Sequence, residues 1–207
     1  YLMSTGSSVA WNMPNRLNFL TIVPMFHCNG WCYPWTIPML NGRTVCLRNI
    51  DVKKIFELID KYNVTHFGGA PIILNMITGA PEADRKKLKN KVYVLTAGAP
   101  PPSIIFKKMK DLGFEVMHVY GLTETYGHVT QCSWNDEWNS FDEDKQNEIK
   151  ARQGVRYPNT EGVTVMDPET MKEVPQDGKT IGEIMIRGNI VMKGYFKDKT
   201  ATDKAMA

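Results

Sequence analysis

The chain has 207 residues, of which 43% are hydrophobic and 23% are charged, close to the averages for soluble globular proteins. These proportions argue against an intrinsically disordered tail, and the longest apolar run, residues 19–25, is too short to cross a bilayer. The net charge is only +3 and basic residues are interleaved with acidic ones, so nothing favours a nucleic-acid partner. We therefore expect a globular protein that binds a small molecule.

No feature of the sequence indicates secretion. The four cysteines are too few and too irregularly spaced for a disulfide framework, and no segment resembles a signal peptide, so we expect a cytoplasmic location. Cys28 and Cys32 lie beside His27, but no second pair of ligands follows, which favours packing roles over a zinc site. The chain begins at Tyr1 without a Met and ends at Ala207 soon after a charged run, so we expect it to be part of a longer protein.

The first elements along the chain are two strands and a helix. Strands are expected at 20–25 and, after an Asn-Gly turn signal, at 43–47. Asp51 can cap a helix that ends near Asn63. The apolar side chains of this helix recur at helical spacing: Val52, Ile55, Phe56 and Ile59.

The alternation of strands and helices continues to residue 119. A strand at 65–68 precedes a helix at 71–78, a strand at 91–96 precedes a helix at 103–112, and a strand at 115–119 follows. Such alternation is typical of an α/β fold. We expect a three-layer, mostly parallel sheet with helices on both faces and right-handed crossovers.

The character of the sequence changes near residue 130. Residues 135–150 are charged and carry tryptophan, and the strand-like runs at 163–166 and 182–187 are short and separated by turn signals. We therefore expect two parts. Residues 1–130 form the α/β part, and residues 131–207 form a charged insertion followed by the start of a small antiparallel β unit.

The most informative stretch is Tyr120-Gly121-Leu122-Thr123-Glu124-Thr125, which follows the strand expected at 115–119. Ligands of open α/β sheets gather at the carboxyl ends of the strands. The stretch offers an aromatic ring for stacking, a hydroxyl for hydrogen bonding to phosphate and a carboxylate oxygen for Mg²⁺. The residues alone support a nucleotide site and a polar loop with an incidental Glu about equally.

This stretch resembles the signature loop of the adenylate-forming superfamily, which includes acyl-CoA synthetases, luciferases and the adenylation domains of peptide synthetases. Three more segments resemble the family in its own order: 24–31 (Pro-Met-Phe-His-Cys-Asn-Gly-Trp), 97–101 (Ala-Gly-Ala-Pro-Pro), and 182–188 with 194–196. On these four collinear matches the chain is identified as a member of the fatty acyl-CoA synthetase-like branch. The resemblance places it inside the large N-terminal domain of such an enzyme.

The resemblance implies roles for the residues of the signature loop. Tyr120 would stack on adenine, Thr123 would contact phosphate and Glu124 would hold Mg²⁺. Gly121 would border both the nucleotide and the acid. Thr123 and Glu124 would be catalytic, together with His27.

The resemblance also implies roles outside the loop. Gly98, Ala99 and Pro100 would form a turn that cups the adenine ring. His27 would border the adenylate site and bind the acid, and Trp31 would line or gate the acyl tunnel. The alternative is that His27 is a buried core histidine and Trp31 a core aromatic residue.

Two stretches that attract attention receive no functional role. Residues 4–8 (Ser-Thr-Gly-Ser-Ser) look like a phosphate loop, but they lack its lysine, so we expect a helix there. Residues 134–152 resemble an insertion found in one branch of the acyl-CoA synthetases, and a charged, solvated helix explains them equally well.

The family's reaction activates a carboxylate with ATP to an acyl-adenylate and pyrophosphate, after which the thiol of CoA displaces AMP. The resemblance therefore implies ATP, Mg²⁺ and CoA as cofactors and a carboxylic acid, expected to be a fatty acid, as substrate of the complete protein. The family's phosphate loop, its Thr-Gly-Asp segment and its C-terminal domain have no match here, so we expect the isolated chain to be inactive. Two alternatives stay open: an adenylation domain that loads a carrier-protein thiol, and a non-catalytic binding module.

Overall fold

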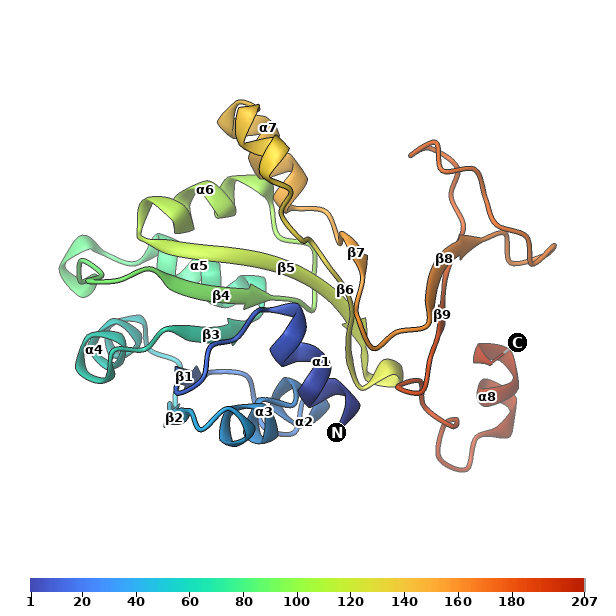
Figure 1. Ribbon diagram of the computed structural model, residues 1–207, viewed down its shortest axis with the longest axis horizontal. Coiled ribbons are helices and arrows are strands. Elements are labelled where there is room, and N and C mark those ends of the chain that lie inside the picture. The colour runs from blue at the N-terminus through green and yellow to red at the C-terminus, as the bar shows by residue number, and fades with distance from the viewer. Residues whose placement is uncertain (207) are drawn as a thin grey trace.

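The computed structural model describes residues 1–206 and contains a seven-stranded sheet of order β2-β1-β3-β4-β5-β6-β7 (Figure 1). Neighbouring strands from β2 to β5 are parallel, and β6 and β7 extend the sheet in antiparallel fashion. The strands are β1 (Asn18–Thr21), β2 (Arg43–Cys46), β3 (His66–Gly69), β4 (Val92–Thr96), β5 (Phe114–Leu122), β6 (Gly127–Gln131) and β7 (Val155–Arg156).

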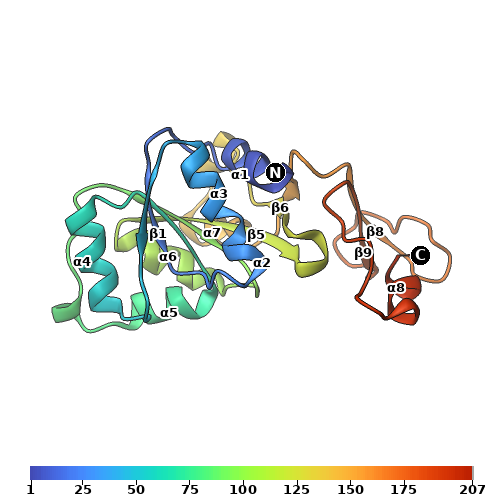
Figure 2. The ribbon, with the colours of Figure 1, turned by 90° about the horizontal axis from the view of Figure 1, so that it is seen from below.

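Helices cover both faces of this sheet, which confirms the three-layer α/β prediction (Figures 1 and 2). Helices α4, α5 and α6 pack on one face, and α1 and α3 pack on the other. The helices are α1 (Leu2–Ala10), α2 (Cys28–Trp31), α3 (Tyr33–Met39), α4 (Val52–Tyr62), α5 (Pro71–Gly79), α6 (Ser103–Asp111), α7 (Glu143–Lys150) and α8 (Lys199–Ala205), with 3₁₀ turns at Glu82–Asp84, Thr123–Thr125 and Asp136–Ser140.

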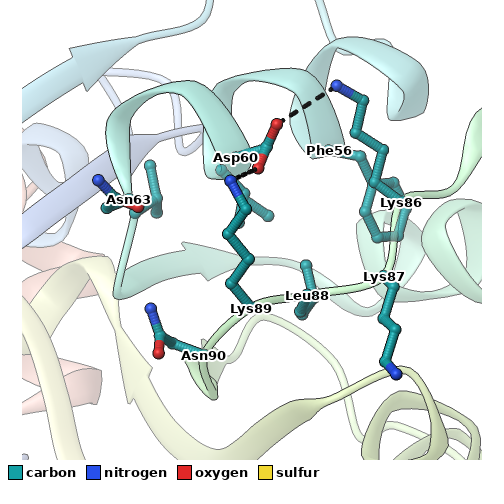
Figure 3. Close-up of a pocket in the computed structure, with 10 residues that line it drawn as sticks. Phe56, Asp60, Asn63, Lys86, Lys87, Leu88, Lys89 and Asn90 are labelled. Atoms are coloured by element: carbon teal, nitrogen blue, oxygen red, sulfur yellow. Dashed lines mark ion pairs between the residues drawn. The ribbon is translucent and has the colours of Figure 1, made fainter.

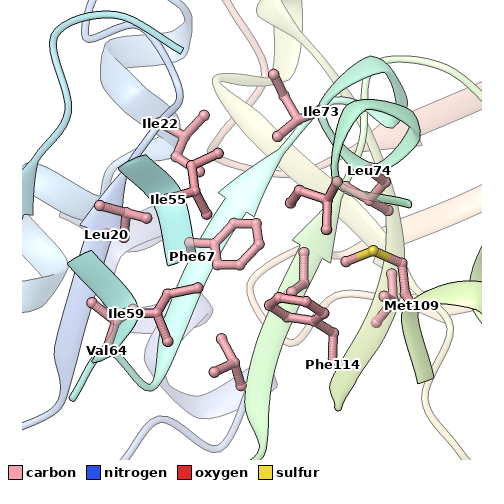
Figure 4. Close-up of a cluster of buried hydrophobic side chains, with 14 of the residues drawn as sticks. Leu20, Ile22, Ile55, Ile59, Val64, Phe67, Ile73, Leu74, Met109 and Phe114 are labelled. Carbon is pink, nitrogen blue, oxygen red and sulfur yellow. The ribbon is translucent and has the colours of Figure 1, made fainter. Parts of the chain in front are cut away.

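The largest hydrophobic cluster joins α4, α5 and α6 to the sheet (Figure 4). Phe67 of β3 lies at its centre, fully buried, with its ring edge-on to Phe114 of β5 at 5.9 Å between centroids. Phe56 of α4 also packs edge-on against the ring of Phe114, with 6.0 Å between the centroids. Burial of a phenylalanine contributes about 1.5–3 kcal/mol, so this cluster holds α4 firmly on the sheet.

A second cluster on the opposite face supports the segment that leads to the site. Trp11, Phe19 and Tyr33 pack there, with the rings of Phe19 and Tyr33 only 4.4 Å apart. Trp31 belongs to the same cluster and is 5% exposed. The path of residues 28–33 is therefore fixed by aromatic packing against β1.

Helix α4 forms where local signals predict it. The carboxylate of Asp51 accepts a hydrogen bond of 2.7 Å from the backbone N–H of Lys54, which caps the first turn. Asn63 ends the helix in the left-handed region, with a φ of 48°. The helix predicted at residues 4–8 is likewise confirmed, because these residues lie within α1.

Two strand boundaries differ from prediction. The expectation of a strand at 20–25 is wrong at its end, because β1 stops at Thr21 and the chain bends before Pro24, which has no N–H to donate. The expectation that a loop starts at Tyr120 is also wrong. Strand β5 continues to Leu122, because Tyr120 and the residues after it pair with β6.

The charged segment before β7 docks on the sheet domain through α7. Lys107 and Lys110 of α6 both pair with Glu143, and Lys150 pairs with Glu115 of β5 at 3.0 Å. Ion pairs that are open to solvent in this way add little to stability. Ile149 is buried, so apolar packing also holds the helix.

The C-terminal part contains a two-stranded antiparallel sheet of β8 (Gly162–Met166) and β9 (Glu183–Arg187), which confirms the expected antiparallel unit. This hairpin and α8 stand apart from the seven-stranded sheet in both views (Figures 1 and 2). The proposed division at residue 130 stays a prediction, and β7 at Val155–Arg156 pairs with β6 in the larger sheet. Within residues 1–206, no helix is both long and apolar enough to span a membrane.

Candidate nucleotide and acid site

A cavity of about 230 Å³ lies at the carboxyl ends of β4 and β5, where the ligands of parallel sheets are expected. Six of the predicted site residues line it, drawn from three separate segments of the chain. The complete lining consists of His27, Cys28, Trp31, Ala97, Gly98, Gly121, Leu122, Thr123, Glu124, Gly127 and His128.

Three predicted residues do not line this cavity. Ala99 and Pro100 are exposed beyond the end of β4. Tyr120 is half-buried and packs beside Met3 and Tyr157. Burial raises the pKa of Tyr120, and the negative charge of Glu124 adds to the effect.

His27 and Trp31 occupy different depths of the site. His27 is exposed at the rim of the cavity, so the alternative of a buried core histidine does not hold. Trp31 is buried and forms part of the wall, where both the packing role and the gating role are compatible with its position. Its indole ring packs closely against Gly68 of β3, because a Cβ added to Gly68 would lie 2.9 Å from the ring.

Buried Thr125 determines the shape of the signature loop. Its hydroxyl accepts a hydrogen bond of 3.0 Å from the Leu122 N–H and donates one of 2.9 Å to the carbonyl of Gly127. These bonds close the 3₁₀ turn, which leaves Thr123 exposed and Glu124 half-buried at the cavity. The sequence motif contained Thr125 but did not reveal this structural role.

Gly121 is required by the close approach of β5 and β6. The register shifts between Tyr120 and Gly121, and a Cβ on Gly121 would lie 1.8 Å from the carbonyl oxygen of Gly127. No side chain fits in that space. The glycine of the motif therefore permits the close pairing of β5 and β6 at the register shift, in addition to any contact with a ligand.

The segment that carries Trp31 has an uncommon backbone. The five residues 28–32 all have positive φ, from 42° at Cys28 to 65° at Cys32, and only Gly30 is a glycine. Helix α2 is thus a left-handed turn. Each non-glycine residue in this region costs about 1 kcal/mol or more, so contacts with the rest of the site must hold it.

Those contacts come from the signature loop. The hydroxyl of Tyr126 donates a hydrogen bond of 2.8 Å to Oδ1 of Asn29. The thiol of Cys28 lies 3.8 Å from Oγ1 of Thr123, and that of Cys32 lies 3.9 Å from the carbonyl oxygen of Tyr126. The expected packing role of the two cysteines therefore takes a specific form, in which they tie the left-handed turn to the loop.

The C-terminal segment also contacts the loop. The hydroxyl of Tyr195 donates to Oε1 of Glu124 at 2.8 Å, and the backbone N–H of Met192 donates to the Glu124 carbonyl at 2.7 Å. The bond to the carboxylate raises the pKa of Tyr195. Sequence reasoning found the Gly-Tyr-Phe match at 194–196 but assigned it no place in the site.

Glu124 is the one predicted metal ligand, and its position suits Mg²⁺ held together with nucleotide phosphates. Among residues 1–206, no group of three or more His, Cys, Asp or Glu side chains is arranged to bind a metal ion by itself. Mg²⁺ usually takes only one or two protein carboxylates and completes its shell with phosphates and water. The half-buried Glu124 at the cavity fits that pattern.

A second hollow, between α4 and residues 86–90, does not offer a comparable site (Figure 3). It lies before the start of β4, at the opposite end of the sheet, and its volume of about 20 Å³ suits roughly one water molecule. Asp60 pairs there with Lys89 at 2.6 Å and with Lys86 at 3.5 Å. These ion pairs account for Asp60, Lys86 and Lys89 without a ligand.

The chain is similar to plant CoA ligases along its whole length. It is 48% identical over 209 residues to the acetate/butyrate--CoA ligase AAE7, peroxisomal, of Arabidopsis thaliana, and 49% identical over 209 residues to the acetate--CoA ligase CCL3 of Humulus lupulus. Each match covers 100% of this chain and 37% of the relative. The chain thus spans little more than a third of the length of these relatives.

The prediction of a cytoplasmic location is wrong. The name of AAE7 places that protein in the peroxisome, and so does the name of the benzoate--CoA ligase of Arabidopsis thaliana, which is 42% identical over 205 residues, 99% of this chain and 35% of that protein. Peroxisomal import relies on short signals that a receptor reads. Composition and the lack of a signal-peptide pattern therefore do not distinguish the two compartments.

A solved structure and a family match support the same assignment as these relatives. The N-terminal domain of FACL13 from Mycobacterium tuberculosis superposes with a TM-score of 0.76 at 25% identity, over 99% of this chain and 49% of that one. The AMP-binding enzyme family matches residues 1–196, which include every segment that lines the cavity. The chain belongs to the AMP-binding enzyme family.

Proposed function

We propose that the complete protein that carries this chain is an AMP-forming acyl-CoA synthetase, an acid–thiol ligase. The observation that carries this proposal is the convergence of His27, Trp31, Gly98, Thr123 and Glu124 on one cavity at the carboxyl end of the sheet. The relatives named as CoA ligases support the same chemistry and favour CoA over a carrier-protein thiol as the acceptor.

The reaction has two steps. A carboxylate oxygen attacks the α-phosphorus of ATP and pyrophosphate leaves, which gives the acyl-adenylate. The sulfur of CoA then attacks the acyl carbon, AMP leaves with the bond electrons, and the thiol proton passes to solvent or a base. The first step brings two anions together, so alignment and charge neutralisation dominate its barrier.

The residues of the cavity suit these requirements. Thr123 presents an exposed hydroxyl for a phosphate oxygen, and Glu124 supplies a carboxylate oxygen for Mg²⁺, which neutralises phosphate charge when bound. Exposed His27 can hydrogen-bond to the carboxylate or the phosphate at the rim. Gly98 and Gly121 leave the backbone accessible to the nucleotide.

The acid is proposed to be small. Buried Trp31 and His128 close one side of the cavity, and their rings meet edge-on with centroids 5.1 Å apart. The relatives named for acetate, butyrate, 2-methylpropanoate and benzoate support a short or compact acid in place of the fatty acid expected from the sequence. A peroxisomal location is proposed as well, since two of the relatives carry it in their names.

The isolated chain is proposed to be inactive. Among residues 1–206, no Lys or Arg side chain lines the cavity, so the chain offers no permanent positive charge between the two anions. Charge neutralisation of that kind must come from residues outside this chain. On its own, the chain is expected to bind nucleotide weakly without forming the adenylate. It would then behave as the non-catalytic binding module that the sequence left open.

The test is an assay of the complete protein with ATP, Mg²⁺, CoA and acetate, butyrate, 2-methylpropanoate or benzoate, in which AMP and the acyl-CoA product are measured. We expect both products to form in equal amounts. Glu124→Gln and Thr123→Ala should each lower kcat by about 10²-fold or more. Wild-type protein that forms neither AMP nor any thioester with these acids would refute the proposal.

A further inference from the structure

The left-handed turn at residues 28–32 places a strained backbone directly beside the buried wall of the cavity. Asn29 has a φ of 48° and Trp31 a φ of 54°. Asn tolerates this region, but a bulky residue such as Trp adopts it only where the surrounding structure holds it there. Because Trp31 is buried in the cavity wall, the contacts that hold the turn also determine where this wall lies.

The strongest of the side-chain contacts between this turn and the signature loop comes from Tyr126. Its phenol hydroxyl donates to Oδ1 of Asn29 over 2.8 Å, the distance of a well-formed hydrogen bond. The contacts of Cys28 and Cys32 are longer, at 3.8 Å and 3.9 Å, and a thiol is a weak donor. Asn29 lies two residues before Trp31. The bond from Tyr126 therefore restrains the backbone from which the indole projects.

Tyr126 does not line the cavity, although it follows loop residues that do. Its backbone is fixed at the loop, because its N–H donates to the carbonyl of Thr123 at 3.0 Å. The shape of the loop depends on the hydroxyl of Thr125, whose bonds to Leu122 and Gly127 do not involve the phenol. The phenol hydroxyl can thus be removed while the loop that carries the proposed ligands of phosphate and Mg²⁺ keeps its own bonds.

We propose that Tyr126 is a positioning residue for the acid, because its bond to Asn29 fixes the turn that carries Trp31. Its place in the chain, next to the proposed ligands of phosphate and Mg²⁺, would suggest a role in binding ATP. Its side chain acts instead on the site of the other substrate. This inference rests on the proposed acyl-CoA synthetase activity and goes beyond it by adding a residue that determines the affinity for the acid.

The test is steady-state kinetics of the complete protein with ATP, Mg²⁺, CoA and the best converted of the four acids named above. Tyr126→Phe keeps the ring and removes the hydroxyl, so the KM for the acid should rise about fivefold. The KM for ATP and kcat should each change by less than about twofold, because only binding of the acid is weakened. A general loss of structure would change all three quantities.

Tyr93→Phe is the matched control for this substitution. Tyr93 lies on β4 outside the cavity, and it is 41% exposed, whereas Tyr126 is 40% exposed. The two variants therefore remove the same hydroxyl group from equally accessible side chains. Tyr93→Phe should leave the KM for the acid and the KM for ATP unchanged.

A second variant removes the same bond from its other end. Asn29→Gly deletes Oδ1, and glycine adopts a positive φ readily, so this variant adds no strain to the turn. It should raise the KM for the acid about as much as Tyr126→Phe does. The double variant should then have a KM for the acid no higher than that of either single variant, because each substitution removes the same interaction.

The outcomes separate this inference from the proposed function. If Tyr126→Phe raises the KM for ATP as much as the KM for the acid, or changes neither, the positioning role is refuted and the synthetase activity stands. Additive effects of the two substitutions would also refute it, because the residues would then act independently. If the wild-type protein converts none of the acids, the proposed function itself fails. Asn29→Gly decides the inference where Tyr126→Phe does not fold.

Discussion

The hydroxyl of Tyr195 donates a hydrogen bond of 2.8 Å to Oε1 of Glu124, a residue 71 positions earlier in the chain. The backbone N–H of Met192 binds the carbonyl of the same glutamate at 2.7 Å. One segment after β9 thus holds both the backbone and the carboxylate of the predicted metal ligand. The C-terminal part of the chain therefore contributes directly to the geometry of the site.

Tyr195→Phe tests this contact. Without the phenol hydroxyl the Glu124 carboxylate is free to rotate, so we expect the Mg²⁺ concentration for half-maximal activity to rise about three- to tenfold. The measurement is a Mg²⁺ titration of AMP formation by the complete protein. Tyr62→Phe on α4 is the matched control, and an identical titration curve for both variants would argue against the positioning role.

Gly121→Ala tests the close pairing of β5 and β6 beside the signature loop. The added Cβ would lie 1.8 Å from the Gly127 carbonyl, so β5 and β6 must separate. We expect the free energy of unfolding to fall by about 3 kcal/mol, with loss of activity. Urea unfolding followed by tryptophan fluorescence measures the effect. In Gly79→Ala the added atom meets nothing within 4 Å, so this control should be neutral or slightly stabilising.

Gly68→Ala tests the support behind Trp31. Its Cβ would lie 2.9 Å from Cε3 of the indole, so the ring must shift toward the cavity. We expect the KM for the acid to rise several-fold while the KM for ATP changes little. Gly162→Ala is the control, because its Cβ would meet its nearest neighbour at an ordinary 3.8 Å. Equal changes in both KM values would show that the indole does not act on the acid alone.

Stability should depend on pH through the buried histidines. Burial lowers the pKa of His66 to about 4 and that of His128 to about 3, below the value of about 6.5 in the unfolded chain. Below pH 6.5 the unfolded chain binds more protons, so the stabilisation present above that pH is lost as the pH falls toward 4. Each histidine should cost about 2 kcal/mol between about pH 7 and about pH 5.

The check is the urea midpoint of the complete protein at the two pH values. His66→Phe should remove only the contribution of His66, because His128 and His118, whose pKa burial also lowers, still contribute. Stability that stays constant over this range would mean that the two imidazoles gain protons equally well in the folded state.

Elements governed by neighbouring residues could be predicted from the sequence. Asp51 and Asn63 cap α4 through contacts within four residues, and the glycine and polar residues of the signature loop indicate a ligand site at a strand end. The parallel order of β3, β4 and β5 follows from the strand–helix alternation.

Other features depend on contacts between distant residues. The extension of β5 requires its pairing with β6 across a register shift, which no local pattern encodes. The left-handed turn at 28–32 is held by Thr123 and Tyr126, almost a hundred positions later. His128 escaped notice because its position in the cavity wall is a property that only the folded chain defines.

The signature loop is the turn of a hairpin, since β5 leads into it and β6 leads out, whereas most site loops of parallel sheets lead into a helix. Its ends are therefore anchored in two neighbouring strands of the same sheet. In hydrogen–deuterium exchange, the backbone amides of β5 and β6 should open together as one cooperative unit. A ligand that protects Thr123 should then also slow exchange in β6, several residues away from any direct contact.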